Sequence, residues 1–213
     1  TFLAIIPLVL YFFKGWDIKK SLFSMSPLIA AVASYLYLRY LVVGFSSPSG
    51  YCEILNDPFC DVNISDKYAT IIYTWLKYWG LLLFPSDLTH DYYPNHIKIR
   101  SWADTDVLIS LIVNLSTITL AFYGIIKRKI YGFALCFYWV CFSIVSNLFF
   151  NVGTFMNERF VFFSSLGYCM LASIIIWEIA QRVFKGRSAA ISFTIVCLVV
   201  SFLYGFKTWD RNY

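Results

Sequence analysis

Long apolar runs separated by short polar connections dominate the chain, and five of these runs have the length of a membrane-spanning helix. Each is about 18 to 22 residues long, and a hydrocarbon core of roughly 30 Å requires about 20 residues in a helix. The five predicted spans are Leu22 to Val43, Val107 to Ile126, Ile130 to Phe150, Phe160 to Ala180 and Ala189 to Phe206. An earlier run, Phe2 to Phe13, is too short to cross, and we expect it to be the end of a helix that begins upstream of Thr1.

The short connections between the apolar runs are basic, and this predicts their side of the membrane. They are Lys14 to Lys20, Lys127 to Lys129, and Arg182 to Arg187. Lysine and arginine accumulate in cytoplasmic loops, so all three are expected on the cytoplasmic side. The remaining connections then face outward, and they are Gly44 to Asp106, Asn151 to Arg159 and the tail from Lys207.

A sixth apolar segment, Lys67 to Phe84, is predicted to lie in the membrane interface. Its polar residues recur at steps of three and four and form one stripe of Lys67, Thr70, Thr74 and Lys77. The opposite face carries Ile71, Ile72, Trp75, Trp79, Leu82 and Leu83. This pattern is typical of an interfacial or re-entrant helix within one outward loop of about 60 residues. The alternative, a short true span, would move every later connection to the other side.

Composition agrees with a membrane protein. Of the 213 residues, 60% are hydrophobic and 14% are charged, and no basic cluster is dense enough to indicate a nucleic-acid partner. Four of the six cysteines lie inside apolar runs. Cys52 and Cys60 lie in the polar outward loop, where they are candidates for a disulfide if that loop faces an oxidising compartment. The predicted fold class is therefore an all-α polytopic membrane protein.

The stretch from Leu81 to Arg100 collects most of the polar chemistry. It contains both histidines, His90 and His96, with Asp87, Asp91, Tyr92 and Tyr93. His90 beside Asp91 is compatible with a general base and its orienting carboxylate, with a metal pair, or with hydrogen bonds that shape a loop. The spacing of the two histidines matches no specific metal-ligand pattern, and no metal site is predicted.

Two further polar groups sit at the outward ends of predicted spans. Arg159, beside Glu158, would place a positive charge at the positive end of a helix, so it requires an anionic partner. That partner is either a lipid phosphate or an acid such as Asp87 or Asp91. Arg39 lies one turn from the outward end of its run. It either snorkels to the interface or provides a second phosphate ligand.

Three segments resemble a known family. LLLFPSDLTHDYYPNHI, SIVSNLFFNVGTFMNERFVFFSSLGYCML and KTWDRNY are similar to the membrane domain of the tetratricopeptide-repeat transmembrane O-mannosyltransferases, and especially to their bacterial relatives. The resemblance covers most of the chain in the same order. It implies a GT-C-like helical bundle that transfers a sugar from a polyprenyl-phosphate carrier to a Ser or Thr hydroxyl of an acceptor protein on the outer face.

The resemblance also implies roles for individual residues. His90, Asp91 and Tyr92, with Asp87, would lie near the sugar and acceptor, and Glu158 would contact substrate. Arg159, with Arg39, would bind the carrier phosphate. The catalytic base would lie upstream of Thr1 and the repeats beyond Tyr213, which would make the chain a membrane-domain fragment, inactive alone.

Several points stay open at this stage. The HDYYP form of the outward motif favours a bacterial inner membrane, with the endoplasmic reticulum as the eukaryotic alternative, and leaves the sugar undecided. No cofactor is implied beyond the lipid-linked donor, and a role for a divalent metal stays open. A transporter subunit and a non-catalytic scaffold that binds a partner through the outward loop are the competing functions.

Overall fold

The computed structural model describes residues 2–44, 57–85, 89, 92, 96–149 and 151–212, and every regular element in these ranges is a helix. The elements are α1 (Phe2–Phe13), α2 (Ile18–Phe23), α3 (Ser26–Val43), α4 (Ile64–Leu83), α5 (Thr105–Ile126), α6 (Ile130–Ser143), the 3-10 turn η1 (Glu158–Val161), α7 (Phe162–Val183) and α8 (Arg187–Asn212). Four helical segments are long and apolar enough to cross a membrane, namely α3, α5, η1 with α7, and α8. An all-α polytopic membrane fold is thereby confirmed.

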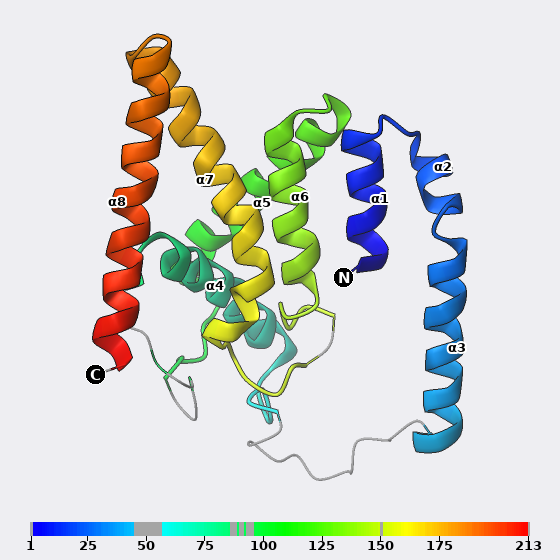
Figure 1. Ribbon diagram of the computed structural model, residues 1–213. Helices are drawn as coiled ribbons and strands as arrows, with labels where there is room; N and C mark the ends of the chain where they lie inside the picture. The colour runs from blue at the N-terminus through cyan, green and yellow to red at the C-terminus, as the bar shows by residue number, and fades with distance from the viewer. Residues whose placement is uncertain are drawn as a thin grey trace.

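The helices form a bundle around α6. α6 packs against α5, α7 and α1, and α8 packs against α7, whereas α4 lies across one end of the group (Figure 1). The α1–α2, α5–α6 and α7–α8 connections all lie at the opposite end of the bundle. These are the three basic connections, so they share one end of the molecule, as the predicted topology requires. η1 and the C-terminal end of α8 lie at the end where α4 crosses.

α4 is a core helix, and its predicted polar stripe is wrong. Thr70 and Thr74, two members of that stripe, are fully buried. Each hydroxyl donates to a carbonyl of the same helix, Thr70 to Asp66 at 2.7 Å and Thr74 to Ile71 at 2.7 Å. When a threonine hydroxyl donates to a carbonyl of its own helix, its hydrogen bond is made locally, so the side chain can face a protein core. α4 is not among the candidate membrane spans, which agrees with the prediction that this helix does not cross the membrane.

Aromatic contacts between α4 and α6 form the centre of the core. Trp79 stacks on Tyr138 with ring centroids 4.5 Å apart, and Tyr78 meets the edge of Phe142 at 5.2 Å. Trp75 is buried with them, and its indole N–H donates to the Ser146 carbonyl at 3.1 Å. The tryptophan face therefore packs on protein rather than in the acyl region predicted for it. Aromatic pairs of this kind contribute beyond their buried area.

Three predicted spans differ in their ends. The first is interrupted between α2 and α3, where Pro27 occupies the first turn of α3, a position that tolerates its missing N–H. α6 ends at Ser143 after 14 residues, and the predicted run does not continue as a helix over residues 144–149. Among the described residues, four rather than five segments therefore have spanning length. α8 continues through the predicted tail to Asn212.

Glycines let the central helices approach closely. A Cβ on Gly167 of α7 would lie 2.6 Å from the backbone nitrogen of Tyr138, and one on Gly124 of α5 would lie 2.4 Å from the Cα of Gly132 on α6. Small residues at such contacts are the usual means of packing membrane helices. They fix α7 against α6, and with it the position of η1.

Candidate functional site

The polar turn η1 forms where the chain enters α7. Asn157 caps it, since its side-chain oxygen accepts the backbone N–H of Arg159 at 3.1 Å. Asn157 is itself buried, and its backbone N–H donates to the Tyr78 hydroxyl of α4 at 2.9 Å. Burial raises the pKa of Tyr78, which keeps the phenol neutral. The core helix α4 thereby sets the position of Glu158 and Arg159.

The loop that follows α4 reaches the same turn. The backbone N–H of Thr89 donates to Oε1 of Glu158 at 2.6 Å, a short bond to a charged acceptor. Tyr92 packs against the hydrophobic core, and its ring lies edge-on to His96 with centroids 5.9 Å apart. Thr89, which belongs to the segment with most of the predicted chemistry, is therefore brought to Glu158, although the two residues are about 70 positions apart in the sequence.

A polar cavity of about 650 Å³ opens beside this turn. It lies between the start of α7, the end of α8 and the loop after α4. Its lining residues are Thr89, Asn157, Glu158, Arg159, Val161, Phe162, Ser165, Tyr204 and Thr208. Glu158 is half-buried, and Arg159 is exposed. Within the described residues the Arg159 side chain forms no ion pair.

The α8 side of the cavity was absent from the sequence-based site. The Tyr204 hydroxyl is placed against the Leu82 and Leu83 carbonyls at 2.7 and 3.0 Å, and this contact joins α8 to the last turn of α4. Thr208 lies one turn further along α8. The sequence signal for both residues was that their hydroxyl side chains lie four positions apart in an apolar helix. This pattern is too common to identify a site.

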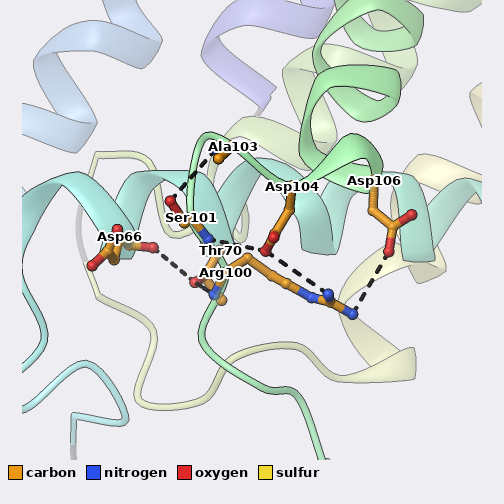
Figure 2. Close-up of polar contacts among 7 residues, drawn as sticks. All are labelled: Asp66, Thr70, Arg100, Ser101, Ala103, Asp104 and Asp106. Atoms are coloured by element: carbon orange, nitrogen blue, oxygen red, sulfur yellow. Dashed lines mark hydrogen bonds and ion pairs between the residues drawn. The ribbon is translucent and has the colours of Figure 1, made fainter.

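Arg100 holds the far end of the loop (Figure 2). Its backbone N–H donates to the Thr70 hydroxyl at 2.8 Å, and its guanidinium extends between Asp104 and Asp106, with N–O distances of 3.8 and 3.6 Å. The guanidinium also lies 4.7 Å from the centroid of the Tyr73 ring. A hydrogen bond to Tyr73 raises the pKa of Arg100 further above its usual value. The loop thus has one end fixed to α4 and the start of α5, and its middle fixed to Glu158.

The other predicted residues fall into two groups. Asp87, His90, Asp91 and Cys52 lie outside the described residues. Cys60 is disulfide-bonded, and the other described cysteines are free. Arg39 lies on α3, none of whose residues is buried and which stands apart from η1 (Figure 1). The structure therefore does not bring Arg39 to Arg159.

The cavity combines one carboxylate, a guanidinium that forms no ion pair with the described residues, and several hydroxyls. A guanidinium presents planar donors that suit a phosphate, and hydroxyls with a carboxylate suit the hydroxyl groups of a sugar. In the part of the chain that the structure describes, no group of three His, Cys, Asp or Glu side chains is arranged to hold a metal ion. The arrangement is suited to binding a phosphorylated sugar compound.

Comparison with known proteins identifies relatives for most of the chain. It is 30% identical over 176 residues to the mouse protein O-mannosyl-transferase TMTC4, 32% identical over 162 residues to the human TMTC4, and 28% identical over 191 residues to the protein O-mannosyl-transferase F38B6.6 of Caenorhabditis elegans. These alignments cover 79%, 70% and 87% of the chain, respectively. No family model matches, and no solved structure matches.

The chain spans about a quarter of the length of these relatives, 24%, 21% and 26% respectively. All three relatives come from animals, and they lend no support to the bacterial inner membrane that the outward motif favoured. The resemblance read from the three sequence motifs is confirmed by these alignments. With its all-helical membrane fold, the chain is similar, over the segment that it covers, to part of the protein O-mannosyl-transferases.

Proposed function

We propose that this segment forms the donor-binding part of a membrane glycosyltransferase. The whole protein would transfer a sugar, mannose if it follows the names of its relatives, from a polyprenyl-phosphate carrier to a protein Ser or Thr hydroxyl on the extracytoplasmic face. The observation that carries the proposal is the polar cavity at Glu158 and Arg159. There the Arg159 guanidinium forms no ion pair with any described residue. A phosphate supplies the counter-charge that this guanidinium lacks.

The proposed reaction is a displacement at the anomeric carbon of the sugar. The acceptor oxygen forms a bond to this carbon, the bond from the carbon to the phosphate oxygen breaks, and its electron pair stays on the phosphate. The hydroxyl proton passes to a carboxylate base, which we place in a part of the protein outside this segment. Arg159 stabilises the charge that grows on the leaving phosphate.

Glu158 and the loop after α4 are assigned to the sugar and acceptor side. Thr89 orients the Glu158 carboxylate, because its backbone N–H donates to Oε1. His90, Asp91, Tyr92 and Asp87 are proposed to contact sugar or acceptor. The segment is further proposed to work within a longer chain that supplies the catalytic loop and the tetratricopeptide repeats.

The test is substitution of Arg159 in the full-length protein, with a lipid-linked sugar as donor and an acceptor peptide. Arg159→Ala is expected to lower kcat/KM for the donor by about 100-fold, the usual loss when one charge-stabilising donor is removed. Arg159→Lys should recover part of this loss because it restores the charge without the planar fork. The matched control is Arg182→Ala, at the other end of α7.

Two outcomes would contradict the proposal. Unchanged donor kinetics in Arg159→Ala would remove Arg159 from the phosphate site. A full-length protein that transfers no sugar, although it is folded and supplied with donor, would favour the scaffold alternative.

A further inference from the structure

The α1–α2 and α5–α6 connections lie at the end of the bundle opposite η1 (Figure 1), and they carry a cluster of cations and aromatic rings. In the connection between α1 and α2, Lys14 and Lys20 flank the indole of Trp16, with their Nζ atoms 5.3 and 4.8 Å from the ring centroid. In the α5–α6 turn, the guanidinium of Arg128 lies 4.6 Å from the centroid of Tyr11. Cations are attracted to such ring faces, so the rings hold these side chains in place.

The two halves of the cluster are adjacent. A Cβ built on Gly15 would lie 3.8 Å from Nη1 of Arg128, so the guanidinium lies against the backbone that joins Lys14 to Trp16. The Tyr11 hydroxyl donates to the Ile125 carbonyl at 3.2 Å, which fixes α1 to the end of α5. Three cations from two connections are thus gathered at one point.

These cations form no ion pair with any described residue. The ion pairs there involve Arg100 and Lys207, both remote from this end of the chain. Asp17 is the one acid in the connection from Lys14 to Lys20, and it forms no ion pair with any described residue. Like charges held close together at a membrane surface require an anion.

An apolar cavity of about 210 Å³ adjoins the cluster between α1, α2 and α5. Its lining residues are Ala4, Pro7, Leu8, Tyr11, Ile18, Ser21, Leu22 and Ile125. Tyr11 belongs to both the cavity wall and the cation cluster. Ser21 is fully buried, with 0% of its surface exposed, and its hydroxyl has no hydrogen-bond partner among the described residues. A buried hydroxyl without a partner is costly, which points to a polar group of a ligand in an otherwise apolar space.

We propose that this is a binding site for an anionic phospholipid. Lys14, Lys20 and Arg128 contact the phosphate, and the cavity receives the ester region and the start of an acyl chain, where the Ser21 hydroxyl donates to an ester carbonyl. The ligand class follows from the presence of a cation cluster beside an apolar cavity. An inorganic anion would contact only the cations, and a neutral lipid would occupy only the cavity. The site is independent of the proposed transferase function, since it lies at the other end of the bundle.

The test uses the full-length protein in neutral detergent micelles, titrated with spin-labelled phosphatidylglycerol and phosphatidylcholine, with the immobilised fraction measured by electron paramagnetic resonance. Saturable binding with a preference for phosphatidylglycerol is expected. The double variant Lys14→Gln/Arg128→Gln should weaken that binding about 30-fold, at roughly fivefold for each cation removed. The matched control, Lys129→Gln/Lys185→Gln, removes two charges from the same end of the molecule but none from the cluster.

A second variant tests the cavity. Ser21→Ala should weaken phosphatidylglycerol binding a few-fold without lowering the unfolding temperature, because the hydroxyl bonds to none of the described residues. Equal losses in the two double variants would show only a general attraction of the basic end to an anionic surface, and would overturn the site. Competition by glycerol phosphate at the same concentration as the lipid would overturn the phospholipid assignment in favour of a simple anion site.

Discussion

At the scale of single residues, the site is held by hydrogen bonds between buried groups far apart in the sequence. The Tyr78 hydroxyl accepts the Asn157 N–H, and the Trp79 indole N–H donates to Oδ1 of Asn114 at 3.1 Å. Both bonds originate on α4, and they end on the turn before α7 and on α5. A buried group that loses its partner keeps its full desolvation cost. These two bonds therefore help to fix the positions of α5 and of the turn before α7 relative to α4.

The Tyr78–Asn157 bond gives the first prediction. Tyr78→Phe should lower the free energy of unfolding by about 1–3 kcal/mol, because the buried N–H of Asn157 is left without an acceptor. Thermal unfolding of the purified protein measures this change. Tyr68→Phe, at an exposed position of the same helix, is the control and should have almost no effect. Equal effects of the two substitutions would show that the hydroxyl of Tyr78 does not hold η1.

Arg100 gives a second prediction at this scale. Its ion pairs are partly exposed, and its contact with the Tyr73 ring is of the same modest strength, so Arg100→Gln should lower the global stability only slightly. The loss should be local and should appear as faster amide hydrogen exchange in residues 96–104. Lys98→Gln, at an exposed neighbouring position, is the control. Exchange that is equally slow in both variants would mean that the backbone bond to Thr70 alone fixes the loop.

At the scale of helices, the sequence predicted those elements whose ends are set by local signals. α5, α7 and α8 follow the apolar runs to within a few residues, apart from the tail of α8, because a basic turn interrupts each run at one end. α6 was predicted too long because the apolar residues continue to Phe150. The end at Ser143 is set instead by tertiary bonds, as Asn147 has a positive φ of 58° and its amide donates to the carbonyls of Thr154 and Phe155. Such bonds leave no periodic pattern in the sequence.

The close approach of α6 and α7 gives an element-scale prediction. Gly167→Ala should lower the free energy of unfolding by about 1–3 kcal/mol, since the added Cβ would lie 2.6 Å from the Tyr138 nitrogen and 2.7 Å from the Ala134 oxygen, and backbone atoms cannot yield as a side chain can. Gly205→Ala is the control on α8, where a Cβ meets nothing within 4 Å. It should be neutral or stabilise its helix by up to about 1 kcal/mol. A neutral Gly167→Ala would mean that the two helices separate without cost.

At the scale of the whole molecule, the candidate site is made by three segments that only the fold brings together. Glu158 and Arg159 could be singled out from the sequence because charges at the end of an apolar run are expensive. Tyr204 and Thr208 could not, because their role depends on α8 returning to the end where α4 crosses. Arg39 was grouped with Arg159 from its depth in a predicted span, but depth does not determine which side of the bundle a helix occupies.

The topology itself supplies the last prediction. If α4 lies in the interface and α5 crosses once, then Lys77 on α4 and Arg128 in the α5–α6 turn face opposite sides of the membrane. Lys77→Cys and Arg128→Cys should therefore react with an impermeant maleimide from different sides, in a background where the free cysteines of α6, α7 and α8 are replaced by alanine. Lys185→Cys, in the α7–α8 connection, should label from the same side as Arg128→Cys, because the α5–α6 and α7–α8 connections lie at the same end of the bundle. Labelling of Lys77→Cys and Arg128→Cys from one side would contradict the position of α4 in the interface.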